Sequence, residues 1–138
     1  MLRGEATFLD DIHLPGEAHA VFVRSVEAHA DIRSINVEAA RSCPGVIDVL
    51  TGADLAADGI GGVPWEVRPV SEKISADPSI PAGDPAIGRP QPAMPTDRAV
   101  FVGQIVAMVI ADTVDRARDA AEEIVVDYEA LSSVTDVE

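Results

Sequence analysis

The segment AVFVGQIVAMVIA, residues 99–111, is the longest apolar stretch of the chain and the one that decides its fold. Its residues are mostly β-branched or small, and only Gly103 and Gln104 interrupt the apolar run. A continuous apolar run of this kind, with no polar alternation, is typical of a strand that is covered on both faces. We therefore expect one buried strand over residues 99–111, at the floor of the core.

The residues that follow this strand predict a helix and a second strand. Asp112 and Thr113 offer side-chain oxygens that can cap a helix. Apolar residues then recur at helical spacing as far as Ile124, while charged residues occupy the positions between them. Residues 124–129, IVVDYE, alternate well enough to form a strand. These elements should form one packed unit in which the helix lies on the sheet.

Upstream of this unit, the pattern predicts several shorter elements. The expected elements are strands over residues 19–24 and 28–33, a helix from residue 36 to residue 43, a strand over residues 46–51 and a turn of helix at residues 52–55. Asn36 can cap the helix. Pro44 and Gly45 should stop it, because proline cannot continue a helix and glycine tolerates the turn that follows.

Residues 59–98 differ in composition from the rest of the chain. They hold eight of the ten prolines, five of the ten glycines and the only tryptophan, Trp65. Loops longer than about 12 to 15 residues are uncommon inside compact domains, and are usually binding loops, lids or disordered segments. The patterned residues beyond this loop are needed to complete the core. We therefore expect a surface excursion from a single domain over residues 1–138, rather than a linker between two domains.

The composition limits the class of protein. A chain of 138 residues with 47% hydrophobic residues can bury one core, and its formal charge of −14 disfavours nucleic acid as a partner. The acidity is typical of a solvated surface, and the alternative is docking to a basic partner. Cys43 is the only cysteine, so the chain alone builds no disulfide and a reducing compartment fits. No apolar run approaches the roughly 20 residues of a membrane helix, and the acidic N-terminus does not resemble a signal peptide. We expect a cytoplasmic domain.

Motif spacing indicates no complete active site. His13, His19 and His29 do not match the spacing of helical or finger-type metal ligands. The glycines at residues 59–62 lack the strand, helix and Lys or Ser/Thr of a phosphate-binding loop. A reactive thiol at Cys43 would need an electropositive neighbour, and we expect Cys43 to be a small buried hydrophobe. We expect no catalytic residue and no metal site in this chain.

Two features leave a structural and a functional interpretation open. Glycine inside a strand pattern indicates a bulge or a close backbone approach, so Gln104 either satisfies nearby backbone groups or is aimed at a neighbouring domain or a cofactor. Trp65 either packs the long loop onto the core or, with Val63 and Val67, lines a pocket or an interface.

A series of short motifs runs through the chain in a fixed order. The motifs are DDI and LPG within residues 10–16, HA and FVRS within 19–25, AHA at 28–30, IRSI at 32–35, PGV at 44–46, TGADL at 51–55, VGQ and VA within 102–107, and residues 117–129 ending in YE. Together they resemble the N-terminal a/b hammerhead domain of molybdenum hydroxylase large subunits. This family contains xanthine dehydrogenase, aldehyde oxidase and aerobic carbon monoxide dehydrogenase. Asp31 and Cys43 depart from the commoner Arg and Leu, which affects surface and packing more than function.

The resemblance implies an α+β hammerhead fold, with a mixed sheet, two helices and the long Pro/Gly-rich loop, at one end of a much longer subunit. Such enzymes oxidise an aldehyde, a nitrogen heterocycle or carbon monoxide at a molybdenum–pterin centre, with oxygen taken from water. Their electrons leave through 2Fe–2S clusters, usually to FAD. The cofactor contacts and the catalytic glutamate of the family lie mostly in later domains, so no catalytic residue is transferred to this chain.

We therefore predict a structural domain or small subunit of a molybdenum hydroxylase that is inactive and binds no cofactor by itself. Its implied partners are the remaining molybdenum-binding domains or subunit and the iron–sulfur and FAD subunits. The loop before the Val-Gly-Gln motif comes near the substrate funnel in relatives, so Val63 and Trp65 are candidate funnel residues. Gly103 and Gln104 are added as candidate interface residues because of the expected bulge. The alternatives are a free-standing protein-interaction module that keeps the fold, and a small-ligand binder with its pocket under the loop at Trp65.

Overall fold

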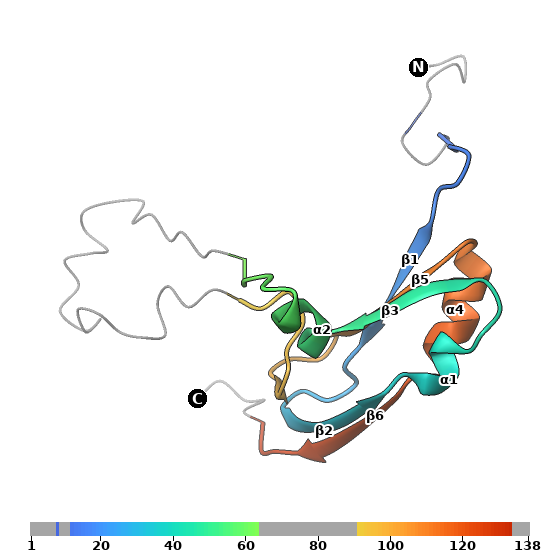
Figure 1. Ribbon diagram of the computed structural model, residues 1–138. Helices are drawn as coiled ribbons and strands as arrows, with labels where there is room; N and C mark the ends of the chain where they lie inside the picture. Colours follow the sequence, from blue (N-terminus) through green and yellow to red (C-terminus); the bar gives the residue numbers. More distant parts are fainter. Residues whose placement is uncertain (1–7, 9–11, 64–90, 134–138) are drawn as a thin grey trace, which may run out of the picture.

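The computed structural model describes residues 8, 12–63 and 91–133. Its elements in chain order are β1 (His19–Arg24), β2 (Ala30–Asn36), α1 (Glu38–Arg41), β3 (Val46–Thr51), α2 (Gly52–Ala57), β4 (Arg98–Ala99), β5 (Ile105–Ala111), α4 (Val114–Glu122) and β6 (Val125–Ala130). In Figure 1, α1 and α4 lie side by side next to β1, β5 and β3, and β2 and β6 run as a separate pair.

The described strands form two three-stranded sheets. β5 is the central strand of the first sheet, between β1 and β3, and the second sheet has the order β4-β2-β6. The register places Met108 of β5 between Phe22 of β1 and Leu50 of β3. All the strand pairings in these two sheets are antiparallel. The expected α+β fold class is confirmed, but the expected mixed sheet is instead two separate antiparallel sheets.

The core lies between the first sheet and α4, and small side chains form much of it. Ala107, Val109 and Ala111 of β5 and Ala117 and Ala120 of α4 are fully buried in one cluster. The three β5 residues share a face because alternate residues of a strand point the same way. Alanine at the facing positions lets the helix approach the sheet closely, so this contact has little room for a larger side chain.

The prediction of one continuous strand over residues 99–111 is wrong. β4 and β5 are separate strands, and they belong to different sheets. Between them, Gly103 has φ of +86°, a left-handed backbone conformation that glycine adopts readily. The glycine therefore marks a turn that carries the chain from one sheet to the other. On the face of β5 away from α4, Met108 and Ile110 are only half-buried among the described residues.

The other predicted elements lie close to their expected positions. β1 and β3 have the expected bounds, and Thr113 Oγ1 accepts a hydrogen bond of 3.3 Å from the Arg116 N–H at the start of α4. The strand expected at residues 28–33 is displaced, because the pairing of β2 with β4 and β6 begins at residue 30 and continues to residue 36. The helix expected from residue 36 to residue 43 is shorter, and α1 ends at residue 41. At its start, Asn36 Oδ1 accepts a hydrogen bond of 3.1 Å from the Glu38 N–H.

Candidate functional site

The turn between β4 and β5 is anchored to the end of β1. The Ser25 N–H donates to the Gln104 carbonyl oxygen, and the Gly103 N–H donates to the Ser25 carbonyl oxygen, both at 2.8 Å. The Arg24 guanidinium adds a third hydrogen bond, of 2.8 Å, to the Gly103 carbonyl oxygen. Gly103 and Gln104 are therefore fixed in place by two consecutive residues of a neighbouring segment.

The Gln104 side chain is buried and supports the same turn. The residue is 7% exposed, and its Oε1 accepts a hydrogen bond of 2.7 Å from the Val100 N–H. A buried amide oxygen with a backbone partner avoids the cost of an unsatisfied polar group. The side chain also borders an open pocket of ≈ 440 Å³, which is lined by Gln91, Pro92, Pro95, Asp97, Arg98, Val100 and Gln104.

The positive charge in this pocket is already paired. Arg98 Nε lies 2.6 Å from Asp31 Oδ1. The hydrogen bond to Asp31 and its negative charge raise the pKa of Arg98 above its ordinary value. An incoming anion would compete with this carboxylate, so the pocket does not resemble a site prepared for phosphate or pterin.

The described residues bring part of the predicted site together. The Val63 N–H donates to the Gln91 carbonyl oxygen at 2.7 Å, and the Gln91 N–H donates back at 3.2 Å. Gln91 lines the same pocket as Gln104, so Val63 lies next to a pocket residue, whereas Gly103 is not among the lining residues. Val63 itself is 63% exposed. Trp65 and Val67 lie outside the described residues.

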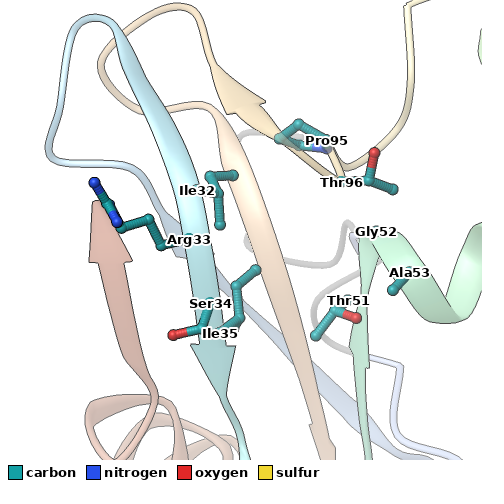
Figure 2. Close-up of a pocket in the computed structure, with 9 residues that line it drawn as sticks. All are labelled: Ile32, Arg33, Ser34, Ile35, Thr51, Gly52, Ala53, Pro95 and Thr96. Carbon is teal, nitrogen blue, oxygen red and sulfur yellow. The ribbon is translucent and has the colours of Figure 1, made fainter. Parts of the chain in front are cut away.

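A second, smaller pocket of ≈ 150 Å³ lies between β2 and the start of α2. Its lining residues are Ile32, Arg33, Ser34, Ile35, Thr51, Gly52, Ala53, Pro95 and Thr96. Figure 2 shows Ile32 and Ile35 on the side of β2 that faces Pro95 and Thr51, whereas Arg33 extends from the opposite side. Arg33 is instead ion-paired with Glu129, at 2.8 Å. The pocket is therefore small and mainly apolar, with its charged residue directed elsewhere.

A carboxylate at the start of α2 forms a cap that the sequence analysis missed. The Thr51 hydroxyl and the Thr51 N–H both donate to Asp54 Oδ2, at 2.6 and 2.7 Å. These hydrogen bonds, together with Arg41 at 3.7 Å, favour the charged carboxylate and lower the pKa of Asp54 below its ordinary value. The Thr-x-x-Asp spacing before a helix was the sequence signal for this contact.

We expect Asp54→Ala to destabilise the chain at pH 7 by about 1 kcal/mol, a typical cost of losing a helix cap. Because the folded-state pKa is lowered, the carboxylate stabilises the fold above its unfolded-state pKa, near 3.8, and this contribution is lost as the pH falls through the folded-state value. Urea unfolding at pH 7 and pH 3 should show a smaller difference between the two chains at pH 3. Asp58→Ala, at the exposed end of α2, is the control. A difference that does not change with pH would contradict the role of the charge.

The three histidines make local contacts in the structure. His13 Nδ1 and His19 Nε2 lie 3.0 and 3.7 Å from Glu17 Oε1. His29 Nδ1 lies 2.9 Å from the Ser132 carbonyl oxygen. Within the described part of the chain, no group of three or more His, Cys, Asp or Glu residues could hold a metal ion. The same residues include no helix that is long and apolar enough to cross a membrane.

Comparison with known proteins identifies the family of this chain. Residues 3–132 match the model of the aldehyde oxidase and xanthine dehydrogenase a/b hammerhead domain. The chain belongs to this family. This hammerhead chain is 36% identical to the carbon monoxide dehydrogenase large chain of Afipia carboxidovorans over 134 residues, which are 97% of this chain and 14% of that protein. It is also 36% identical to aldehyde oxidase 1 of Bos taurus, over 95% of this chain and 8% of that protein.

Solved structures lead to the same family. The quinoline 2-oxidoreductase of Pseudomonas putida 86 superimposes with a TM-score of 0.78 at 34% identity, and the match covers 99% of the hammerhead chain and 15% of that chain. A carbon monoxide-reduced Cu,Mo-CO dehydrogenase gives a TM-score of 0.77 at 33% identity, over 98% of the hammerhead chain and 14% of that chain. The hammerhead chain thus spans only a small part of the length of these relatives, and the expected resemblance is confirmed.

Proposed function

We propose that this chain is the hammerhead domain of a molybdenum–pterin hydroxylase, and that it contributes structure rather than reacting groups. The observation that carries the proposal is a match over 97% of this chain but only 14% of a carbon monoxide dehydrogenase large chain. On this proposal, residues 1–138 form a single domain of a larger enzyme. Its place is the cytoplasm, which suits a chain with a single cysteine.

The proposed reaction of the assembled enzyme is the oxidation of an aldehyde, a nitrogen heterocycle or carbon monoxide, with water as the oxygen source. Relatives named carbon monoxide dehydrogenase, aldehyde oxidase 1 and quinoline 2-oxidoreductase support this range. Molybdenum–pterin, 2Fe–2S clusters and FAD would belong to the remaining molybdenum-binding domains or subunit and to iron–sulfur and FAD subunits. Two relatives from Paenarthrobacter nicotinovorans are named as subunits, which supports an assembly of this kind.

The described residues do not fit the molybdenum–pterin group itself. The arginine of the larger pocket is held by Asp31 rather than directed to a free anion site. We therefore assign no step of the reaction to a residue of this chain.

Four residues are proposed to line the substrate funnel or an interface of the assembled enzyme. Val63 and Trp65 are proposed as walls of the substrate funnel, which the exposure of Val63 beside the larger pocket supports. Gly103 and Gln104 are proposed as interface residues, because they shape a turn with exposed apolar neighbours.

The metal content of the native assembly tests the proposed function. We expect the assembly purified with this chain to contain about one molybdenum per chain, and to oxidise an aldehyde, a nitrogen heterocycle or carbon monoxide in a dye-linked assay. The 138-residue chain produced alone should contain no molybdenum and give no turnover. Elemental analysis and the same assay on both samples measure this.

Two results would contradict the proposal. Turnover by the pure 138-residue chain would show that the reaction centre lies within it. A native assembly without molybdenum would favour the alternative, a protein-interaction module that has kept the hammerhead fold.

A further inference from the structure

Four large apolar side chains are exposed where the end of β1 meets the turn before β5. Val100, Phe101 and Val102 are 52%, 49% and 64% exposed, and Val26 is 76% exposed. Ser25, the residue before Val26, is hydrogen-bonded to Gly103 and Gln104, the two residues that follow Val102. We call these four residues the apolar knob. A run of exposed apolar residues is unfavourable in water unless another surface covers it.

The apolar knob is held in one conformation by hydrogen bonds behind it. The buried Gln104 side chain accepts the Val100 N–H at 2.7 Å. The Ser25 N–H donates to the Gln104 carbonyl oxygen, and the Ser25 carbonyl oxygen accepts from the Gly103 N–H, both at 2.8 Å. A surface that is already ordered loses little conformational freedom on binding, so the geometry suits a docking surface better than a flexible loop.

A further exposed apolar side chain, Phe22, lies on β1 and is separated from the knob by Arg24. Phe22 is 47% exposed. Arg24 lies between it and the knob: its guanidinium lies 6.0 Å from the Phe22 ring centroid and donates to the Gly103 carbonyl oxygen. Phe22 thus provides a second reporter close to the knob.

The charge around the knob differs from that of the whole chain. The chain carries a net charge of −14, whereas residues 98–104, RAVFVGQ, contain no acidic residue. The exposed side of α4, by contrast, is acidic and carries Asp115, Asp119 and Glu122. Asp97 precedes these residues and Glu27 follows Val26, so the acid-free part is the turn itself, and its exposed apolar side chains suit an apolar partner. Two copies of a chain with charge −14 repel each other, which disfavours self-association through it.

We propose that the apolar knob docks onto an apolar surface of the molybdenum-carrying remainder of the enzyme. This inference rests on the proposed function. The matched region is 14% of the Afipia carboxidovorans carbon monoxide dehydrogenase large chain, so most of such a chain lies outside it and can supply the covering surface. The partner is therefore a part of the same enzyme rather than a separate ligand.

Covalent footprinting of the native assembly and of the 138-residue chain tests the docking. We expect carbene labelling of Phe101 and Phe22 to fall at least fivefold in the molybdenum-containing assembly. Val125 is 65% exposed on β6, outside the knob, and its labelling is the internal control. In the native assembly, Phe101→Asp should restore at least half of the Phe22 labelling, whereas Val125→Asp should leave it unchanged. Thermal unfolding of the 138-residue chain checks that both variants fold.

The outcomes separate this inference from the function on which it rests. Equal labelling of the knob in a molybdenum-containing assembly and in the 138-residue chain overturns the docking and leaves the proposed function intact. Protection of the knob already in the 138-residue chain overturns it as well, whether mass measurement shows a dimer or a monomer covered by its own residues. An assembly without molybdenum, or no assembly, overturns both proposals.

Discussion

Replacing Ala117 by leucine should destabilise the chain by about 3 kcal/mol, at the upper end of the usual cost of overpacking a core. Ala117 is fully buried on the side of α4 that faces the first sheet, in a cluster with Ala107 and Val109 of β5. A leucine adds three carbon atoms where helix and sheet meet through small side chains, so α4 must move away from β5. Urea unfolding followed by circular dichroism measures the loss.

The adjacent position on α4 provides a matched control for this substitution. Arg118 is exposed, and its side chain makes only a surface ion pair of 3.5 Å with Asp115. Arginine and leucine have similar helix propensities, and exposed ion pairs contribute little, so Arg118→Leu should change the free energy of unfolding by less than about 1 kcal/mol. A similar loss for both substitutions would contradict close packing as the cause.

The helix that carries Ala117 was predictable because its signals are local. Apolar residues recur at helical spacing, and Thr113 precedes them as a cap whose hydroxyl meets the Arg116 N–H in the structure. The division of residues 99–111 was not predictable in the same way. An apolar run shows that a strand is favoured, but it does not show which sheet the strand joins. Gly103 indicated an irregularity in the strand, but glycine is favoured both in a bulge and in a turn between two sheets, so the sequence could not distinguish the two.

The candidate site shows the same limit. Gln104 is a polar residue in an apolar stretch, and its partner Val100 is only four residues away. Its hydrogen bond to a nearby backbone group could therefore be predicted from the sequence. Arg98, which lines the larger pocket, and its ion-pair partner Asp31 are 67 residues apart in the sequence. Their pairing depends on how β4 lies against β2, and no spacing motif contains that information. The contact between Thr51 and Asp54 at the start of α2 corresponds to a local Thr-x-x-Asp motif, which the sequence analysis missed.

Replacing Gly52 by alanine should cost about 2 kcal/mol in the free energy of unfolding, within the usual range for overpacking. A Cβ at this position would clash with the Pro95 carbonyl oxygen and lie 2.8 Å from that of Met94. Both contacts are with backbone, so no side chain can rotate to relieve them. The segment that closes the smaller pocket must therefore move away from α2 (Figure 2).

The loss at Gly52 is expected although alanine usually favours a helix. Alanine is about 1 kcal/mol better than glycine in a helix interior, so a net loss means that the clash outweighs this gain. Gly61 is the matched control, because a Cβ there meets nothing within 4 Å among the residues that the structure describes. Gly61→Ala should leave the urea midpoint unchanged or raise it slightly, since it reduces the conformational freedom of the unfolded chain. If Gly52→Ala were as stable as Gly61→Ala, the segment at Pro95 could not be held against α2 as the structure places it.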